Sequence, residues 1–193
     1  MDNEEVLNIW IPYRLQGIQT LWWAYNQLQD LPQPRELQVF VDGKQLIQGN
    51  ASAVLNPMVE AGFIHARCLL EFLGLGVKKG RLVAIDNRRT DDIAIELYKA
   101  NGVPLEKVSP AAALSAYTGS QDRGERALLA IFELANKGLA HFTSAFPDGY
   151  NSVDLEIACK GIPALVQNHL YTKLNMPVPA PPKPNLEDRS LRS

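Results

Sequence analysis

Apolar residues recur at helical spacing along most of this sequence, and that periodicity constrains the fold more than any other feature. The clearest case runs from about Ala51 to Leu73. The residues that form its apolar stripe are Leu55, Val59, Gly62, Ala66, Leu69 and Leu73. Because an α-helix has about 3.6 residues per turn, this spacing places them on one face of an amphipathic helix. The pattern predicts a mostly α fold in the form of a single helical bundle.

Three further long helices are predicted, together with one short helix. The long helices cover about 13–29, 123–142 and 152–174, and the short one covers about 90–100. Pro12 suits the first turn of the first helix, where its missing N–H costs little, and Pro163 is expected to bend the last helix. Thr90 is a candidate N-cap for the short helix, and Asn101-Gly102 is the signal that would end it.

Asp42-Gly43 predicts a small β-hairpin at about 37–47. Apolar residues alternate before this dipeptide, and Asp-Gly favours a type I′ turn because both central residues need positive φ. The glycine-rich stretch GLGVKKG (74–80) should end the preceding helix, and residues 102–121 should form a loop with one helical turn around its alanines. From Pro177 onward, five prolines in eight residues predict a disordered tail.

The totals fit one cytoplasmic domain. The chain has 193 residues, of which 46% are hydrophobic and 21% charged, so we predict one domain at 1–176 and the tail at 177–193. The net charge of −2 gives no overall attraction to nucleic acid or to an anionic membrane. Cys68 and Cys159 are the only cysteines, so no disulfide framework is expected. An acidic start and no apolar run near about 18 residues predict a cytoplasmic protein with no membrane partner.

The candidate chemistry lies on two of the predicted helices, the first of which is the one that ends at Leu73. His65 lies at the edge of its apolar stripe, and Glu60, Arg67 and Glu71 lie on the far side. Arg67 and Glu71 are four residues apart and can form an ion pair. The alternative is a histidine at the edge of the core beside an ordinary solvated face.

The second of these helices, predicted over 123–142, carries Asn136, Lys137 and His141. An asparagine beside an apolar face needs hydrogen-bond partners, because leaving it without them costs about 1–3 kcal/mol. A histidine near a cation, as His141 is near Lys137, could transfer protons close to neutral pH. The alternative is that Asn136 and His141 bond to neighbouring helices or to the backbone.

The spacing of His65 and Cys68 would allow both side chains to bind one metal ion. Side chains three residues apart on a helix can bind one ion, but a zinc site would need two further ligands, for which His141 and Cys159 are the candidates. We predict neither a metal nor a cofactor.

Together the two helical segments resemble a group of bacterial helical proteins related to the HEPN superfamily. The resemblance is carried by NPMVEAGFIHARCLLEFL (56–73) and by NKGLAHFT (136–143). It implies a helical bundle of a kind that often forms dimers, so we expect a homodimer. Many HEPN domains are metal-independent ribonucleases with an Arg-x4–6-His motif on a late helix. In them the histidine assists proton transfer and the arginine steadies the phosphate.

The resemblance places His141 at the position of the motif histidine. The arginine position falls on Asn136 or Ala135, and neither side chain can neutralise phosphate charge as a guanidinium does. Arg67 would then have to supply the charge, or else Arg126 or Lys137 would.

Two functions therefore stay open. The missing arginine favours a HEPN-like, non-catalytic or RNA-contacting interaction module. The alternative is a metal-independent ribonuclease in which His141 transfers protons, Asn136 contacts the substrate and Arg67 supplies the charge. Glu60 and His65 match the companion helix of the group.

The sequence has one local basic patch and one pair of adjacent tryptophans. The patch consists of Lys78, Lys79, Arg81, Arg88 and Arg89. Its cations could contact an RNA backbone, and an ordinary solvated loop is the alternative. Trp22 and Trp23 point about 100° apart on a helix, so one should lie in the core and the other is a candidate interface anchor.

Overall fold

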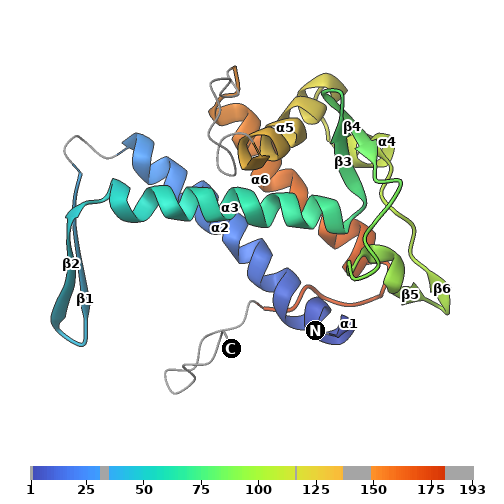
Figure 1. Cartoon of the computed structure of the whole chain (residues 1–193), viewed down its shortest axis with the longest axis horizontal. Coiled ribbons are helices and arrows are strands. Elements are labelled where there is room, and N and C mark those ends of the chain that lie inside the picture. The colour runs from blue at the N-terminus through green and yellow to red at the C-terminus, as the bar shows by residue number, and fades with distance from the viewer. Residues whose placement is uncertain (1, 31–34, 116, 137–148, 181–193) are drawn as a thin grey trace.

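The computed structural model describes residues 2–30, 35–115, 117–136 and 149–180. Within these ranges the fold is mostly helical, with small antiparallel hairpins, as predicted (Figure 1). Four helices, α2 (Ile11–Asp30), α3 (Ser52–Phe72), α5 (Gln121–Glu133) and α6 (Ser152–Val166), surround the main hydrophobic core. A smaller cluster of Ala24, Ala51 and Leu55 lies between α2 and the start of α3.

Helices α2 and α3 cross in close contact because glycines lie at the crossing. A Cβ atom on Gly62 would meet the Cβ of Leu21 at 2.3 Å and the carbonyl oxygen of Gly17 at 3.0 Å. A Cβ on Gly17 would meet the ring of His65 at 2.2 Å. The predicted stripe of α3 is buried in this packing, apart from half-buried Val59. Helix α3 and its buried face are thus confirmed.

The predicted start of the first helix at residue 13 is wrong. Helix α1 (Asn3–Glu5), the π-helical turn η1 (Val6–Trp10) and α2 follow one another without a break. Pro12 therefore lies inside a helix. In the π turn the N–H of Ile11 bonds to the carbonyl of Val6. The next donor in that register would be Pro12, which has no N–H.

A distant tyrosine supplies the missing donor. The Tyr171 hydroxyl, which is buried, donates to the Leu7 carbonyl oxygen over 2.6 Å. Tyr171 lies in a second π-helical turn, η4 (Gln167–Tyr171), which directly follows α6. The predicted last helix is thus present, with Pro163 inside α6. Tyr98 ties down the same N-terminal stretch, because its hydroxyl donates to the Asn3 carbonyl oxygen over 2.9 Å.

The hairpin predicted at 37–47 is confirmed and is longer than expected. Strand β1 (Glu36–Val41) pairs antiparallel with β2 (Lys44–Asn50), with a register shift after Val39. Asp42 and Gly43 have φ of 49° and 74°, the positive values that a type I′ turn requires. This hairpin connects α2 to α3 and projects away from the other helices (Figure 1).

Two further hairpins form where the sequence predicted a loop at 74–80 and the end of a short helix at about 100. Strands β3 (Leu75–Lys78) and β4 (Arg81–Ala84) pair where GLGVKKG was expected only to end a helix. Strands β5 (Lys99–Ala100) and β6 (Val103–Pro104) pair around Asn101-Gly102. Both turns have two residues at positive φ, namely Lys79 and Gly80 in the first and Asn101 and Gly102 in the second. Each of these dipeptides therefore makes a hairpin turn.

The short helix predicted over 90–100 is wrong. Only the 3-10 turn η2 (Ile95–Leu97) forms there. Ile95 and Tyr98 are buried in the core, and their side chains anchor an irregular segment that leads into β5. The helical turn expected within 102–121 is confirmed as α4 (Pro110–Ser115).

The remaining predictions fall partly outside the described residues. The helix predicted over 123–142 begins at Gln121 and is helical through Asn136, and residues 137–148 lie outside. A disordered tail is predicted from residue 177 onward. Val178 instead packs against the core, and residues 181–193 lie outside the described residues. Trp22 packs against the core, whereas Trp23 is 52% exposed. No helix within the described ranges combines the length and the apolar character needed to cross a membrane.

Replacing Gly62 by alanine should destabilise the protein by about 1–3 kcal/mol, because the added methyl group overpacks the α2–α3 crossing. Gly161→Ala is the matched control, since a Cβ at Gly161 in α6 meets nothing within 4 Å. Alanine there should stabilise by up to about 1 kcal/mol. Urea unfolding measures both variants, and equal shifts of the midpoint in the same direction would contradict the close crossing.

Stability should fall as the pH rises from 10 to 12. Burial raises the pKa of Tyr98 from 10.0 to about 12, so the folded state retains a proton that the unfolded state releases in this window. Folding then weakens with rising pH. Tyr98→Phe should flatten this part of the curve of unfolding free energy against pH, although the variant loses the bond to Asn3 at every pH. Parallel curves for both proteins would contradict the assignment.

Candidate functional site

The two segments that the sequence singled out meet in the structure. Arg67 lies on α3, and Asn136 lies in the helical residues that follow α5. A guanidinium N–H of Arg67 donates to the side-chain oxygen of Asn136, across 69 positions of sequence. Arg67 and Asn136, two of the candidate site residues, are therefore in contact.

The charge of Arg67 is balanced by a carboxylate. Its Nε donates to Oε1 of Glu71, one turn along α3, over 2.8 Å. The Arg67 side chain is 31% exposed and that of Glu71 is 40% exposed, so water also reaches the pair. Asn136 and Glu71 together engage two of the five N–H groups of the guanidinium. Arg67 is held in place by its own neighbours on two helices.

His65 belongs to a different contact. Its Nδ1 lies 3.2 Å from Nη1 of Arg14 on α2, and the Tyr13 ring packs edge-on against the imidazole at 5.2 Å. Because arginine can only donate, Nδ1 accepts this bond and the proton of the neutral ring resides on Nε2. His65 thus joins α2 to α3 beside the Gly17 contact.

Of the other predicted site residues, Glu60 is exposed on α3. Lys137 and His141 lie outside the described residues. Of the predicted site residues that the structure describes, Arg67 and Asn136 meet, and Glu71 joins them as the ion-pair partner of Arg67.

A small cavity of about 200 Å³ lies between α2, α3 and the segment before η2. Arg14, Cys68, Glu71 and Arg88 are among its lining residues. Burial raises the pKa of the Cys68 thiol above its ordinary value, which keeps it protonated and weakly nucleophilic at neutral pH. Within the part of the chain that the structure describes, no three His, Cys, Asp or Glu side chains gather as metal ligands would.

The predicted basic patch divides into two parts. Lys78, Lys79 and Arg81 are exposed at the end of the β3–β4 hairpin, and Arg89 is exposed as well. Arg88 is only 15% exposed and pairs with Glu96 over 3.2 Å.

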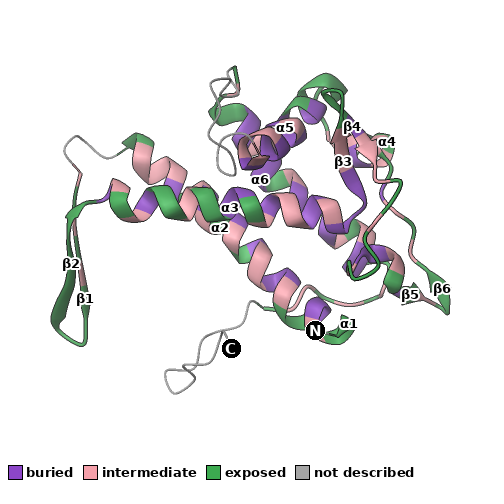
Figure 2. Ribbon diagram, viewed as in Figure 1, coloured by how far each residue is buried: buried purple, intermediate pink, exposed green. Residues whose placement is uncertain are grey.

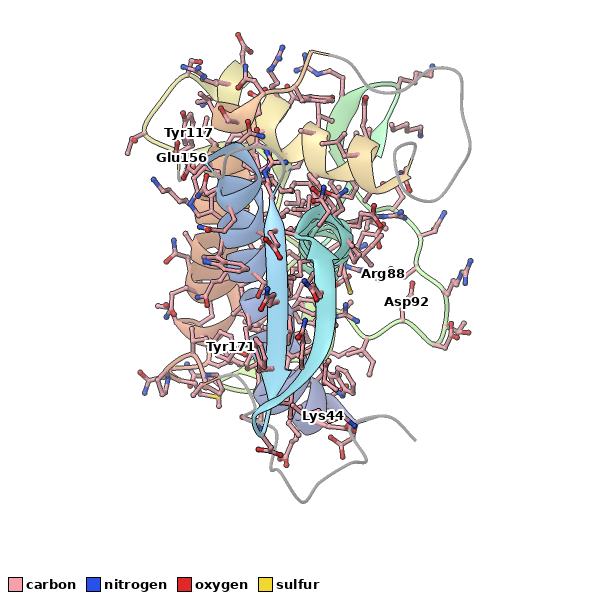
Figure 3. The ribbon with its side chains drawn as sticks, turned by 90° about the vertical axis from the view of Figure 1, so that its left-hand side faces the viewer. Lys44, Arg88, Asp92, Tyr117, Glu156 and Tyr171 are labelled. Atoms are coloured by element: carbon pink, nitrogen blue, oxygen red, sulfur yellow. The ribbon has the colours of Figure 1, made fainter. Side chains whose placement is uncertain are left out.

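Arg88 also closes the end of α3. Its guanidinium donates to the carbonyl oxygens of Glu71 over 2.8 Å and Phe72 over 3.3 Å. The last carbonyls of a helix have no partner within the helix and carry partial negative charge. Arg88, which Figure 3 labels, is thus a helix cap. Sequence reasoning missed this role because the carbonyls that Arg88 binds lie 16 and 17 positions away, in a different element.

Two buried carboxylates were also missed. Glu125 is 8% exposed and accepts from the Leu82 N–H over 3.0 Å, so it joins α5 to β4. Asp154 is 2% exposed and accepts from the Arg126 Nε over 3.0 Å. Arg126, one of the alternative cations for a phosphate site, is therefore held by a buried acid.

Tyr150 lies next to Arg126. The guanidinium carbon of Arg126 lies 5.6 Å from the centre of the Tyr150 ring. Burial, with a further contribution from the Glu133 carboxylate, raises the pKa of Tyr150 to about 12. Its phenol is therefore neutral at physiological pH.

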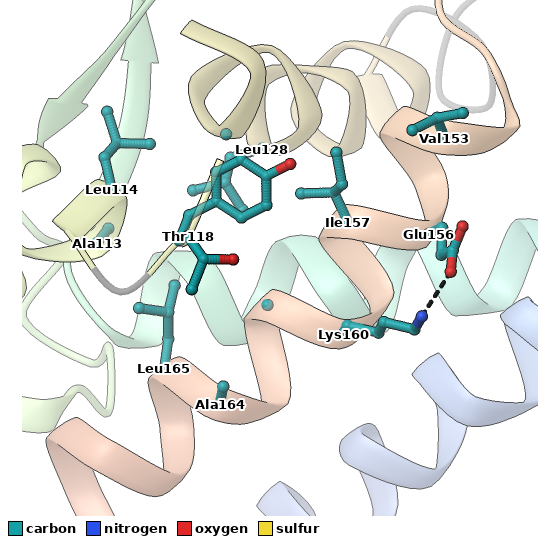
Figure 4. Close-up of a pocket in the computed structure, with 13 residues that line it drawn as sticks. Ala113, Leu114, Thr118, Leu128, Val153, Glu156, Ile157, Lys160, Ala164 and Leu165 are labelled. Atoms are coloured by element: carbon teal, nitrogen blue, oxygen red, sulfur yellow. Dashed lines mark hydrogen bonds and ion pairs between the residues drawn. The ribbon is translucent and has the colours of Figure 1, made fainter. Parts of the chain in front are cut away.

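A groove of about 400 Å³ opens between α4, α5 and α6. Apolar side chains such as Leu114, Leu128 and Ile157 form much of its wall, and the ion pair between Glu156 and Lys160 lies along α6 (Figure 4). The groove offers apolar contact and lies apart from Arg67.

No protein-family model matches the chain, and neither a curated protein nor a solved structure matches it. The HEPN resemblance therefore stays a prediction, and function has to be argued from the geometry of the site.

The contact between Arg67 and Asn136 should appear as coupling in a double-mutant cycle. We expect Arg67→Ala and Asn136→Ala together to cost about 0.5–1.5 kcal/mol less than the sum of the single changes, because each removes the same hydrogen bond. Unfolding in urea gives the four free energies. A cycle of Glu60→Ala with Asn136→Ala is the control and should be additive. Equal coupling in both cycles would contradict the contact.

Proposed function

We propose that this protein is a non-catalytic interaction module built on a HEPN-like helical bundle. The observation that carries the proposal is the pairing of Arg67 with Glu71. A ribonuclease site needs a cation aimed at the phosphate, because negative charge grows on the phosphate oxygens in the transition state. A carboxylate 2.8 Å from Arg67 balances that cation and repels an incoming phosphate.

The position of the family arginine supports the same proposal. Ala135 is fully buried and has no charge, and the side-chain oxygen of Asn136 accepts from Arg67. Arg126, the other described candidate cation, is paired with Asp154. Each described arginine that could replace the family arginine is thus engaged by an acid of this chain.

Apolar side chains on the surface support a role in protein contacts. We call residues 36–50, the β1–β2 hairpin, the arm. Its large exposed apolar side chains are Phe40, Val41, Leu46 and Ile47. A cluster of such side chains on one projecting element is typical of a surface that binds another protein. Most residues of the arm are exposed (Figure 2). Cys68 and Cys159 are not in a disulfide, which fits a reducing, cytoplasmic setting.

A metal-independent ribonuclease that uses His141 is the second candidate. It is favoured by one observation, the contact between Arg67 and Asn136. This contact brings the two family-like segments to one place, and His141 follows Asn136 by five positions. RNA contact through Lys78, Lys79 and Arg81 would accompany either function.

We expect no cleavage when the purified protein is incubated with mixed RNA in EDTA. The measurement compares the wild type with Glu71→Gln, which frees Arg67 from its carboxylate, and with His141→Ala. Each protein is first shown to be folded by circular dichroism. Cleavage by the wild type that His141→Ala abolishes would overturn the non-catalytic assignment in favour of the ribonuclease. Cleavage by Glu71→Gln alone would show that the Glu71 carboxylate is what silences the site.

A further inference from the structure

The arm lacks the support that a two-stranded sheet needs. Among the described residues β1 pairs only with β2, and every residue of β2 is exposed. Leu37 is the arm residue that packs against the cluster of Ala24, Ala51 and Leu55. An isolated two-stranded hairpin is at best marginally stable in water, and three or more strands are normally required. The arm therefore gains stability if another strand joins it.

The two edges of the arm differ in how open they are to another strand. On β2 the register pairs Val39 with Ile47 but Phe40 with Gln45, which leaves Leu46 as an extra residue in a bulge. Bulges and lysines are devices that protect an edge from further pairing, and β2 also carries Lys44. Strand β1 has the sequence ELQVFV, with no lysine and no proline. Its outer edge is the unprotected one.

From these observations we propose that the outer edge of β1 pairs antiparallel with β1 of a second copy of this chain, so that two arms form one four-stranded sheet. This inference rests on the proposed interaction function and names its partner. The contact is isologous, since the same edge serves both copies across a two-fold axis. Figure 3 looks onto the arm, which stands in front of the helices in that view.

The charges of the arm favour a second copy. In an antiparallel pair of β1 strands, Glu36 at one end lies near the Phe40–Val41 end of the partner strand. The two Glu36 carboxylates are then at opposite ends of the seam, so they do not face each other. Asp42 and Lys44 lie at the turn and carry opposite charges. Exposed Phe40 and Val41, at 55% and 50%, lie along the strand that forms the seam.

The test is the mass in solution, measured by sedimentation over a range of concentrations on the full chain. We expect the wild type to sediment as two chains of 21.4 kDa each. The variant Gln38→Lys with Phe40→Ser places one lysine of each copy near the middle of the seam and should raise the dissociation constant at least about tenfold, because these like charges then lie close together and the apolar contact of Phe40 is lost.

A matched control lies on the other strand. The variant Gln48→Lys with Leu46→Ser also replaces one glutamine by lysine and one exposed apolar side chain by serine, and Gln48 is the cross-strand partner of Gln38. Leu46 is 59% exposed, similar to Phe40. This control should change the dissociation constant by less than about threefold, because β2 lies outside the seam. Circular dichroism and urea unfolding verify that both variants fold.

The other sedimentation results would each overturn part of the proposal. Equal weakening by both variants would overturn edge pairing through β1, and a wild type that stays monomeric would overturn the dimer. Hydrogen exchange gives a second readout, since the amides of β1 should lose protection on dilution of the wild type. The RNA assay separates the two proposals. A monomer that does not cleave RNA leaves the interaction function in place, whereas a dimer that cleaves RNA overturns that function and keeps the inference.

Discussion

The close crossing of α2 and α3 determines where the other features of this protein lie. It requires glycine at Gly17 and Gly62, because a Cβ on either would overlap the opposite helix. On one side of the crossing the two helices end in the arm that joins them. On the other side α3 presents His65 to α2 and Arg67 to the residues after α5. The arm and the polar cluster are therefore held at separate parts of one rigid pair of helices.

Charged and apolar side chains are used in opposite ways on this molecule. Arg67, Arg88 and Arg126 are each paired with an acid of the same chain, so their charges act mainly to hold helices, strands and helix ends together. Exposed apolar side chains, in contrast, collect on the arm. Covering such a surface removes apolar side chains from water, which is favourable.

Local patterns predicted the fold well, and long-range partners account for what they missed. The stripe of α3 and the Asp42-Gly43 turn depend on neighbouring residues only, so their helix and hairpin are found. Pro12 was placed at a helix start because the hydroxyl that replaces its missing N–H comes from Tyr171, far along the chain. The sequence pattern places Arg88 in a basic patch because its carbonyl partners on α3, 16 and 17 positions away, belong to a different element. The contact of Arg67 with Asn136 spans 69 positions, and no local pattern in the sequence predicts it.

The bond between Tyr171 and Leu7 spans 164 positions of sequence, which has a consequence for synthesis on the ribosome. Val6, Leu7 and Ile11, which are buried in the folded protein, leave the ribosome before η4 does. At about 5–20 residues per second, the delay before η4 is made is on the order of ten seconds. During that time the apolar face of the first helix has no native cover from η4. The native packing of the N-terminal stretch therefore has to wait until η4 has been made.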